Sequence, residues 1–161
     1  MVEWVDWERA GVVVEYGPGT GVFTHEIVQH VRPDATFFAV EANEAFAAAF
    51  RESFPDILLY EDSVENIGAI CDQRQVSTID CIVSGLPWAA FSEQKQDLYL
   101  DEMLRKMADG GQFSTFAYLQ GLVLPSARRF RHRLEETFTS VETSDTVWKN
   151  LPPALVYRCR K

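Results

Sequence analysis

The chain has 161 residues, and its hydrophobic content of 47% and charged content of 24% are ordinary for a globular protein with a real core. We therefore expect one domain over residues 1–161. The formal net charge of −9 argues against a protein that binds the phosphate backbone of nucleic acids. No apolar run reaches the about 18 residues of a transmembrane helix, and no signal peptide is visible. A cytoplasmic protein is expected, with peripheral attachment to a membrane left open.

The cysteines and histidines do not form a metal-binding pattern. Cys71, Cys81 and Cys159 contain no C-x-x-C pair, and Cys81 and Cys159 lie in strand-like runs. We expect buried, reduced thiols. The histidines share no metal-ligand spacing with one another or with the cysteines, so no metal site is expected.

The first strongly patterned stretch follows residues 1–10, which we expect to cover an edge of the core. Val12, Val13 and Val14 predict a buried strand, because β-branched residues favour strands. Glycines spaced by two residues come next, and the run 22–31 has the apolar spacing of a helix. A strand, a glycine turn and a helix form the first half of a nucleotide-binding βαβ unit.

The turn Gly17-Pro18-Gly19-Thr20-Gly21 discriminates between nucleotide ligands. Its glycines let the main chain approach a ligand without a Cβ in the way. The dinucleotide fingerprint needs a glycine where Val22 stands, and the sequence contains no Walker motif. Glu15, just before the turn, would repel a pyrophosphate but suits a ligand with positive charge. S-adenosylmethionine, which carries a sulfonium and an ammonium, is therefore the predicted cofactor; the alternative is a tight strand–helix turn.

Residues 35–41 predict a second strand, which ends in Glu41. In doubly wound nucleotide folds an acid at this place accepts hydrogen bonds from the ribose hydroxyls, and a carboxylate can accept from both. Glu41 and the neighbouring Ala42 are therefore predicted to contact the cofactor. The alternative is a solvated strand end.

A third predicted strand, residues 57–60, leads to Asp62 and Ser63. An acid just past this strand can accept the exocyclic amine of adenine, and Ser63 can contribute its backbone while it caps the next helix. The alternative for Asp62 is a simple cap or turn acid.

The fourth predicted strand, residues 77–83, ends in the loop Ser84-Gly85-Leu86-Pro87-Trp88. Ligands in open α/β sheets bind beyond the carboxyl ends of the strands, near the switch in strand order. This loop should therefore face the glycine turn across a crevice. Ser84 and the loop carbonyls offer hydrogen-bond acceptors, and Trp88 offers a flat π face. The alternative is an ordinary turn with Trp88 packed in the core.

Three further helices are expected. The second helix of the chain begins at Asn43, and its phenylalanines at four-residue intervals are interpreted as core: Phe46, Phe50 and Phe54. A long helix starts at Ser92 and is ended by Asp109-Gly110-Gly111. A later helix over 126–134 turns four residues inward: Ala127, Phe130, Leu134 and Phe138. Its basic face is interpreted as a solvated surface, with a membrane or phosphate role as the alternative.

The C-terminal part predicts a change in strand direction. A fifth strand over 112–118 is followed by an apolar loop, 119–125, on the ligand side. Two last strands, 141–148 and 154–159, are joined by a link too short for a crossover helix, so they must be antiparallel. We expect an α/β fold: a seven-stranded, mostly parallel sheet with an antiparallel C-terminal hairpin and helices on both faces.

In this order the segments resemble the class I S-adenosylmethionine-dependent methyltransferases, whose Rossmann-like methyltransferase fold is then expected. Within that class, E-Y-G-P-G-T-G-V-F-T, S-G-L-P-W-A-A-F and N-L-P-P-A-L-V-Y resemble bacterial phospholipid N-methyltransferases, which are relatives of the ribosomal RNA adenine dimethylases. The resemblance covers nearly the whole chain.

The resemblance implies roles for the matching residues. It assigns the methionine part of the cofactor to Glu15 and the glycine turn, the ribose to Glu41, and the adenine to Asp62 and Ser63. The acceptor pocket would be lined by residues of the loop after the fourth strand and by one tyrosine: Ser84, Leu86, Pro87, Trp88 and Tyr118. Similar phospholipid methyltransferases usually begin with an additional basic, amphipathic helix that binds membrane and covers the site. That helix is missing here, which leaves open a truncated chain, another membrane surface or a different substrate.

The predicted activity is N-methylation of the amine of a phospholipid head group, of the phosphatidylethanolamine type, with the lipid presented at a membrane surface. One alternative is adenine N-methylation in ribosomal RNA or another nucleic acid, although the acidic composition argues against a nucleic-acid partner. The others are methylation of a small molecule and a non-catalytic cofactor-binding subunit. A homodimer is left open.

Overall fold

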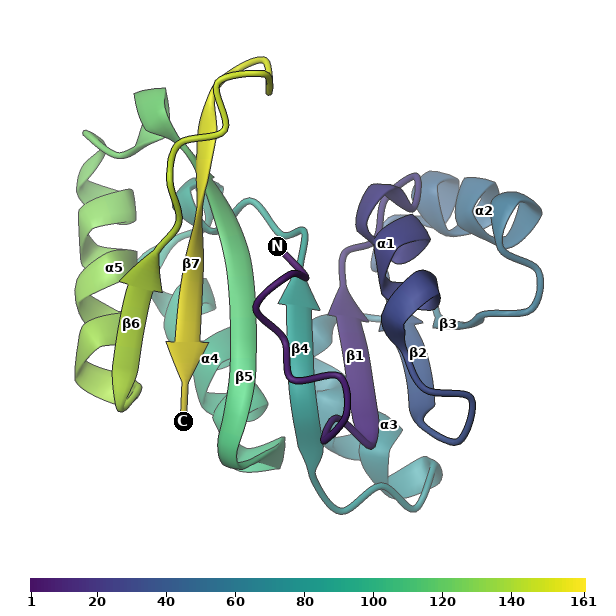
Figure 1. Cartoon of the computed structure of the whole chain (residues 1–161). Helices are drawn as coiled ribbons and strands as arrows, with labels where there is room; N and C mark the ends of the chain where they lie inside the picture. Colours follow the sequence, from purple (N-terminus) through teal and green to yellow (C-terminus); the bar gives the residue numbers. More distant parts are fainter.

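A seven-stranded sheet organises the chain, and the computed structural model describes all residues from 1 to 161. The valines of β1 (Val12–Tyr16) place this strand at the centre, where it runs parallel to β2 (Thr36–Val40) and to β4 (Ile79–Ser84). The strand order is β3-β2-β1-β4-β5-β7-β6 (Figure 1), which confirms the predicted sheet. The other strands are β3 (Leu58–Tyr60), β5 (Met107–Tyr118), β6 (Ser140–Thr143) and β7 (Ala154–Arg160).

The C-terminal hairpin is antiparallel, as predicted. Strand β7 runs antiparallel to both β5 and β6, and its first residue, Ala154, pairs with Tyr118 at the end of β5. Strand β6 is shorter than the predicted 141–148, because the ladder is interrupted at Ser144. The Ser144 hydroxyl accepts the hydrogen bond of the Val156 N–H at 3.0 Å, and beyond it Val147 forms an isolated bridge to Ala154.

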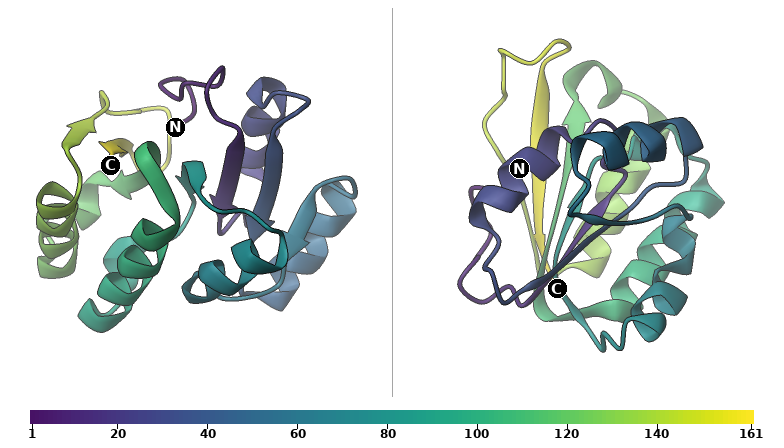
Figure 2. Two further views of the ribbon diagram at one scale, coloured as in Figure 1. Left: turned by 90° about the horizontal axis from the view of Figure 1, so that it is seen from below. Right: turned by 90° about the vertical axis from the view of Figure 1, so that its right-hand side faces the viewer.

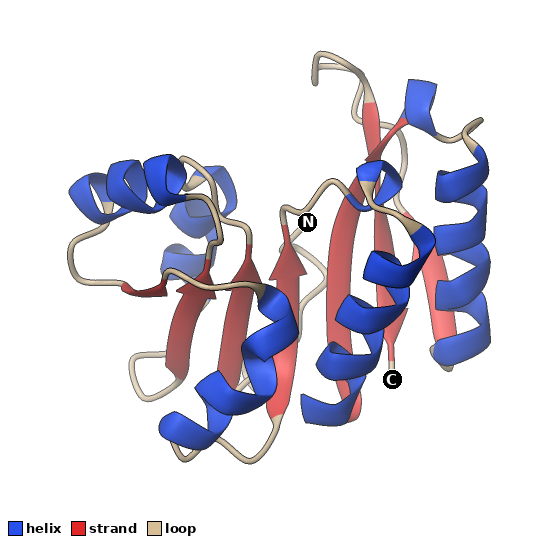
Figure 3. Cartoon of the chain, turned by 180° about the vertical axis from the view of Figure 1, so that it is seen from behind, coloured by secondary structure: helices blue, strands red, loops and turns tan.

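Two layers of helices cover the sheet (Figure 2, left). Alternate side chains of β1 point to opposite faces. Val13 packs with Ile27 in one buried cluster, whereas Val14 lies in the larger cluster with Ile67 and Leu100. The first face carries α1 (Val22–His30) and α2 (Glu44–Ser53). The second face, seen in Figure 3, carries α3 (Ile67–Gln73), α4 (Glu93–Lys106) and α5 (Pro125–Thr137). Short 3₁₀ helices are η1 (Val64–Asn66), η2 (Trp88–Ala90) and η3 (Leu119–Gly121). None of these helices combines the length and the apolar character needed to span a bilayer.

The N-terminal segment covers the edge of the core, as expected. Val2, Val5 and Ala10 are buried with Ile27 of α1. The Gln112 side chain of β5 holds this segment by accepting a hydrogen bond from the Asp6 N–H at 2.8 Å and donating one to the Trp4 carbonyl at 3.1 Å. The three cysteines are free and buried, which confirms their predicted state.

The predicted end of the long helix was wrong. Helix α4 ends at Lys106, four residues before Gly110, and β5 begins at once. The Lys161 ammonium at the end of the chain donates hydrogen bonds to the carbonyls of Leu104 and Met107, at 2.9 and 2.7 Å, and so satisfies acceptors at the end of the helix. The glycines instead occupy an irregularity of β5, with Gly110 at φ 77°.

The interpretation of all three α2 phenylalanines as core was also wrong. Phe50 is buried, but Phe46 is 48% exposed at the carboxyl edge of the sheet, because the first turn of α2 extends past the end of β2. Phe54 is half-buried and packs beneath the glycine turn, where a Cβ on Gly21 would lie 2.0 Å from its Cε2. Gly21 also has φ +85°, so a larger residue is strained there as well as crowded.

The basic face of α5 is largely paired with acids of α4. The Arg129 guanidinium lies 2.7 Å from an Asp97 oxygen, and Arg133 lies 3.0 Å from an oxygen of Asp101. Arg131 pairs with Glu135 on α5 itself. These contacts tie the two helices together at the surface.

A buried carboxyl group, that of Glu15, ties β1 to α1. Thr24 Oγ1 donates a hydrogen bond to Glu15 Oε2 at 2.6 Å, while Glu15 Oε1 has no hydrogen-bond partner. Burial raises the pKa of Glu15 from its ordinary 4.5 to about 7, and the hydrogen bond from Thr24 opposes only part of this rise. The native state therefore holds this proton more tightly than the unfolded chain does.

The core of α4 can be tested with two leucines of the same helix. Leu100 is fully buried and Leu98 is 44% exposed. We expect Leu100→Ala to lower the free energy of unfolding by about 2–5 kcal/mol, because it leaves a cavity in the core. Leu98→Ala, the matched control, should change it by less than about 0.5 kcal/mol. Urea unfolding of the two variants measures both values, and equal losses would contradict this packing.

The Glu15 carboxyl predicts a dependence of stability on pH. Because the native pKa is the higher one, the stabilisation is fully present below about pH 4.5 and is lost as the pH rises through 7. The loss amounts to about 3 kcal/mol. Glu15→Gln keeps an acceptor for Thr24 without the charge, so the variant should lack this loss and be more stable than the wild type at high pH. Urea unfolding at about pH 5 and about pH 8 tests this, and parallel curves would contradict it.

Candidate cofactor and acceptor site

The turn after β1 touches the loop after β4, as the sequence predicted. A Cβ on Gly17 would lie 2.6 Å from Leu86 Cδ2, and a Cβ on Gly85 would lie 2.5 Å from the Gly17 carbonyl oxygen. The Gly85 N–H also donates to the Tyr16 carbonyl at 2.8 Å. Glycine at 85 is what allows the two main chains to approach so closely, and glycine at 17 makes room for the Leu86 side chain.

A crevice opens around this contact. Its two halves are cavities of ≈ 560 Å³ and ≈ 550 Å³ that share Gly17, Gly19, Phe46 and Gly85. A Cβ on Gly19 would meet nothing within 4 Å, so the main chain of the turn is open to the crevice there. Each half has the size of a small-molecule site, and the glycine turn forms the wall between them.

One half of the crevice is lined by the charged residues Glu41, Asp62 and Lys95, and we call it the polar half. The Glu41 carboxylate accepts hydrogen bonds from the Gly19 N–H at 3.2 Å and from the Asn43 N–H at 2.9 Å. These main-chain donors fix the carboxylate against the turn and leave it capacity for further donors, because an ionised carboxylate has about four acceptor positions. The exposed Ala42 follows it and lines the same half.

Asp62 also lines the polar half. Its Oδ1 accepts from the Ser63 N–H at 2.7 Å and from the Asn66 side chain at 2.8 Å, as a turn acid does. Ser63 is the N-cap residue of η1, as predicted, but its side chain makes no capping hydrogen bond, because its hydroxyl lies 3.2 Å from the Tyr99 hydroxyl. Sequence patterns missed Lys95, which lies at the same half with its ammonium 5.0 Å from the Phe91 ring.

Glu15 is not brought to the crevice surface. Its side chain is fully buried on the α1 side of the sheet, where it accepts from Thr24. The negative charge that lines the crevice comes from Glu41 and Asp62. Of the rest of the turn, Pro18 is buried and Thr20 is exposed, and both line the other half.

The loop after β4 is organised by Ser84. This fully buried hydroxyl accepts hydrogen bonds from Trp88 Nε1 at 3.0 Å and from the Leu86 N–H at 3.3 Å. The Trp88 ring is 2% exposed and stacks on Phe130 with the ring centres 4.8 Å apart. Its face is therefore packed in the core rather than open to a ligand, and Pro87 is the exposed residue of this loop.

The carbonyl groups of this loop differ in their hydrogen bonding. The Leu86 carbonyl accepts from the Trp88 N–H, and the Pro87 carbonyl accepts from the Ala90 N–H. The Gly85 carbonyl accepts no hydrogen bond from the protein, and Gly85 lines both halves of the crevice. An acceptor group is thus available where the two segments meet.

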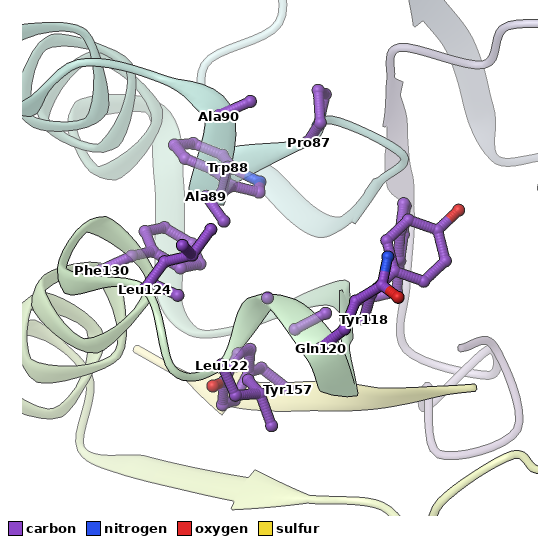
Figure 4. Close-up of a pocket in the computed structure, with 14 residues that line it drawn as sticks. Pro87, Trp88, Ala89, Ala90, Tyr118, Gln120, Leu122, Leu124, Phe130 and Tyr157 are labelled. Carbon is purple, nitrogen blue, oxygen red and sulfur yellow. The ribbon is translucent and has the colours of Figure 1, made fainter. Parts of the chain in front are cut away.

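An apolar pocket of ≈ 220 Å³ lies on the other side of the loop (Figure 4). The predicted apolar segment 119–125 contributes Leu122 and Leu124 to its wall, and Phe130 and Tyr157 come from α5 and β7. Tyr118 stands between the pocket and the crevice and lines both, as does Phe116. Phe116 and Tyr157 were not predicted as site residues, because a strand pattern does not show which of its residues meet a neighbouring loop.

Comparison with known proteins gives the family. No protein-family model matches the sequence. The ornithine lipid N-methyltransferase of Singulisphaera acidiphila is 31% identical over 159 residues, which are 97% of this chain and 79% of that relative.

Solved structures give the same fold. The O-methyltransferase TomG of Streptomyces achromogenes, in complex with S-adenosylmethionine, matches with a TM-score of 0.72 at 14% identity, over 95% of this chain and 74% of its own. Fibrillarin of Aeropyrum pernix, with natively bound S-adenosyl-L-methionine, matches with a TM-score of 0.68 at 12% identity, over 92% and 66%.

The polar crevice beside a glycine turn fits the predicted cofactor, because it combines an open main chain at Gly19 with the carboxylates of Glu41 and Asp62. Together with the relative, these features establish the chemistry of the chain. It is an S-adenosylmethionine-dependent methyltransferase, and it belongs to the class I methyltransferases in the family of the ornithine lipid N-methyltransferase.

Proposed function

We propose that this enzyme methylates the amine of a membrane lipid head group. The observation that carries the proposal is the apolar pocket beside the loop 84–88, because it shares Phe116 and Tyr118 with the cofactor crevice. A lipid whose acyl chain occupies the pocket has its polar head directed toward the crevice. The relative is named for methylating an ornithine lipid, whose head group likewise carries an amine.

The placement of the residues supports the cofactor roles that the family resemblance implies. The turn Gly17-Pro18-Gly19-Thr20-Gly21 holds the methionine part, and Glu41 accepts from the ribose hydroxyls. Asp62 and Ala42 line the adenine end, and Ser63 follows Asp62 there. Glu15 does not contact the cofactor. It supports the turn indirectly, because its hydrogen bond with Thr24 holds α1 against β1. Bound S-adenosylmethionine supplies an electrophilic methyl group.

The acceptor amine must be neutral and must be aligned with that methyl group. We assign the alignment of the amine to the Gly85 carbonyl. This carbonyl accepts a hydrogen bond from an N–H of the amine, so the lone pair of the amine nitrogen points away from the loop. Holding the two reactants in line can contribute roughly 7–11 kcal/mol toward lowering the barrier. The proton released by the amine leaves to solvent at the mouth of the crevice, since the apolar pocket contains no acidic side chain.

Tyr118, rather than Trp88, offers an open aromatic face to the cationic product. A cation is attracted to an aromatic face by about 0.5–2 kcal/mol, depending on desolvation. Tyr118 is 39% exposed at the boundary between pocket and crevice, so its ring can face the cationic product, whereas Trp88 is stacked on Phe130. Trp88 supports the loop through Ser84, and Leu86 and Pro87 shape its surface.

Nucleic acid is the less suited acceptor. The nucleic-acid alternative relies on Trp88 to stack on a flipped base, and Trp88 is only 2% exposed. The net charge is −9, and Arg129, Arg131 and Arg133 are engaged with carboxylates.

The lipid acceptor is tested by transfer of a labelled methyl group. The enzyme is incubated with labelled S-adenosylmethionine and vesicles that contain either phosphatidylethanolamine or an ornithine lipid. We expect label in the lipid extract, with transfer efficiency rising as the acyl chain lengthens, by about 0.8 kcal/mol for each methylene that the pocket buries. Cofactor binding without label in either lipid would contradict the proposal, and label in added RNA or in a soluble amine would redirect it.

The role of Glu41 is tested by cofactor affinity. Glu41→Ala removes a charged acceptor, so binding of S-adenosylmethionine should weaken by about 1–3 kcal/mol, roughly a 5- to 150-fold increase in Kd. Glu44→Ala, three residues away on the exposed first turn of α2, is the control and should bind as the wild type does. Titration calorimetry measures both, and an unchanged Kd for Glu41→Ala would remove this residue from the site.

A further inference from the structure

The exposed apolar side chains of this protein gather at one edge. Ten large hydrophobic residues are exposed, and all except Leu58 and Leu98 lie where the parallel strands end, at the top of Figure 1. We call this set the apolar rim: Val22, Phe46, Tyr118, Val123, Leu124, Val147, Trp148 and Leu151. Scattered single hydrophobic residues are normal on a surface, but a gathered set marks a contact surface.

The most exposed members lie on the connection between β6 and β7, residues 144–153. Trp148 is 72% exposed and Leu151 is 90% exposed. This connection projects beyond the helices and strands around it in two views (Figures 1 and 2, right). Its shape is held from within, because the Val147 N–H donates to the Ala154 carbonyl at 2.8 Å and the Asn150 side chain donates to the Pro152 carbonyl at 2.8 Å.

Two exposed cations, one on this tip and one a helical turn after Leu124 of the rim, have no acidic partner. Lys149 lies between Trp148 and Leu151, and Arg128 lies in the first turn of α5, and neither forms an ion pair. The exposed Asp145 is the one acid of the connection. Tryptophan and leucine beside a lysine are typical of segments that sit among lipid head groups, where the ring and the aliphatic chain are buried and the ammonium meets phosphate.

The rim also surrounds the openings of the site. Val22, Phe46 and Val147 line the crevice, and Leu124 lines the apolar pocket. Whatever covers the rim therefore lies directly above the place where the acceptor enters. A projecting tip fits a planar, deformable surface, whereas a folded protein would need a hollow of matching shape.

We propose that the 144–153 connection inserts Trp148 and Leu151 into the interfacial layer of a lipid bilayer and so docks the crevice at the lipid surface. The inference deepens the proposed function and rests on it in one respect, namely that the acceptor resides in that bilayer. It assigns membrane binding to a segment between two C-terminal strands, with Lys149 and Arg128 meeting lipid phosphates.

The test compares two double variants of the full chain. Trp148→Ser/Leu151→Ser removes the tip, and Leu58→Ser/Leu98→Ser removes the two exposed leucines outside the rim as the matched control. Flotation with vesicles of phosphatidylethanolamine, phosphatidylcholine and phosphatidylglycerol measures binding. We expect the first variant to lose roughly tenfold or more in partitioning, because each buried side chain contributes that order of affinity, and the control to partition as the wild type does.

The same variants separate docking from chemistry. Methylation of lipid in vesicles should fall with vesicle binding in the tip variant. Methylation of a short-chain, water-dissolved phosphatidylethanolamine should be unchanged, as should the Kd for S-adenosylmethionine. In the wild type, vesicles should shift the tryptophan emission to shorter wavelength, and Trp148→Phe should abolish this shift although Trp4, Trp7 and Trp88 are still present.

Vesicle binding by the tip variant at the wild-type level would overturn the inference, as would an equal loss in the control. Light scattering compares the oligomeric state of the two proteins. A dimeric wild type and a monomeric tip variant that still binds vesicles would overturn the inference, because the tip would then contact a second copy of the chain. If the tip variant loses vesicle binding but no lipid in any form is methylated by the wild type, the docking stands and the proposed acceptor fails.

Discussion

The structure depends on the contact between two main chains, at Gly17 and Gly85. Hydrophobic pairing of β1 with β4, as of Val14 beside Ile82, brings the ends of the two strands to one level. Glycine at 85 then lets the two main chains meet, because a Cβ there would come within 2.5 Å of the Gly17 carbonyl oxygen, and glycine at 17 leaves room for the Leu86 side chain. The crevice and the loop 84–88 share this wall, so their separation is set by the core of the sheet.

Around that contact the site divides by polarity. Carboxylates fixed by main-chain donors line one side, at Glu41 and Asp62, and the apolar pocket lies on the other. This division suits a reaction between a polar, cationic donor and an acceptor that carries both an amine and an acyl chain. Trp88 contributes indirectly, because its indole bonds to Ser84 and stacks on Phe130, which ties the acceptor loop to α5.

The charged side chains differ in their pairing according to where they lie. Arg129 and Arg133 bind acids of α4 and brace the two helices behind the pocket, while Lys149 and Arg128, near the apolar rim, have no acidic partner. Glu15 is buried without full hydrogen bonding, and its raised pKa shows what that burial costs the charged form. The carboxyl group that the motif places nearest the turn thus supports α1 rather than lining the crevice.

The sequence by itself determined the sheet, its antiparallel end, the glycine turn and the position of Glu41, because strand periodicity, glycine spacing and a short β6–β7 link are local signals. The methyltransferase class came from the resemblance of these motifs, in their order, to a known family. Tertiary structure decided where side chains point. It packed Trp88 into the core and left Phe46 exposed, it turned Glu15 away from the crevice, and it ended α4 early with the ammonium of Lys161. These outcomes join residues far apart in the chain, such as Trp88 with Phe130 and Leu104 with Lys161. The local sequence around one residue does not show which distant residue it will contact in the fold.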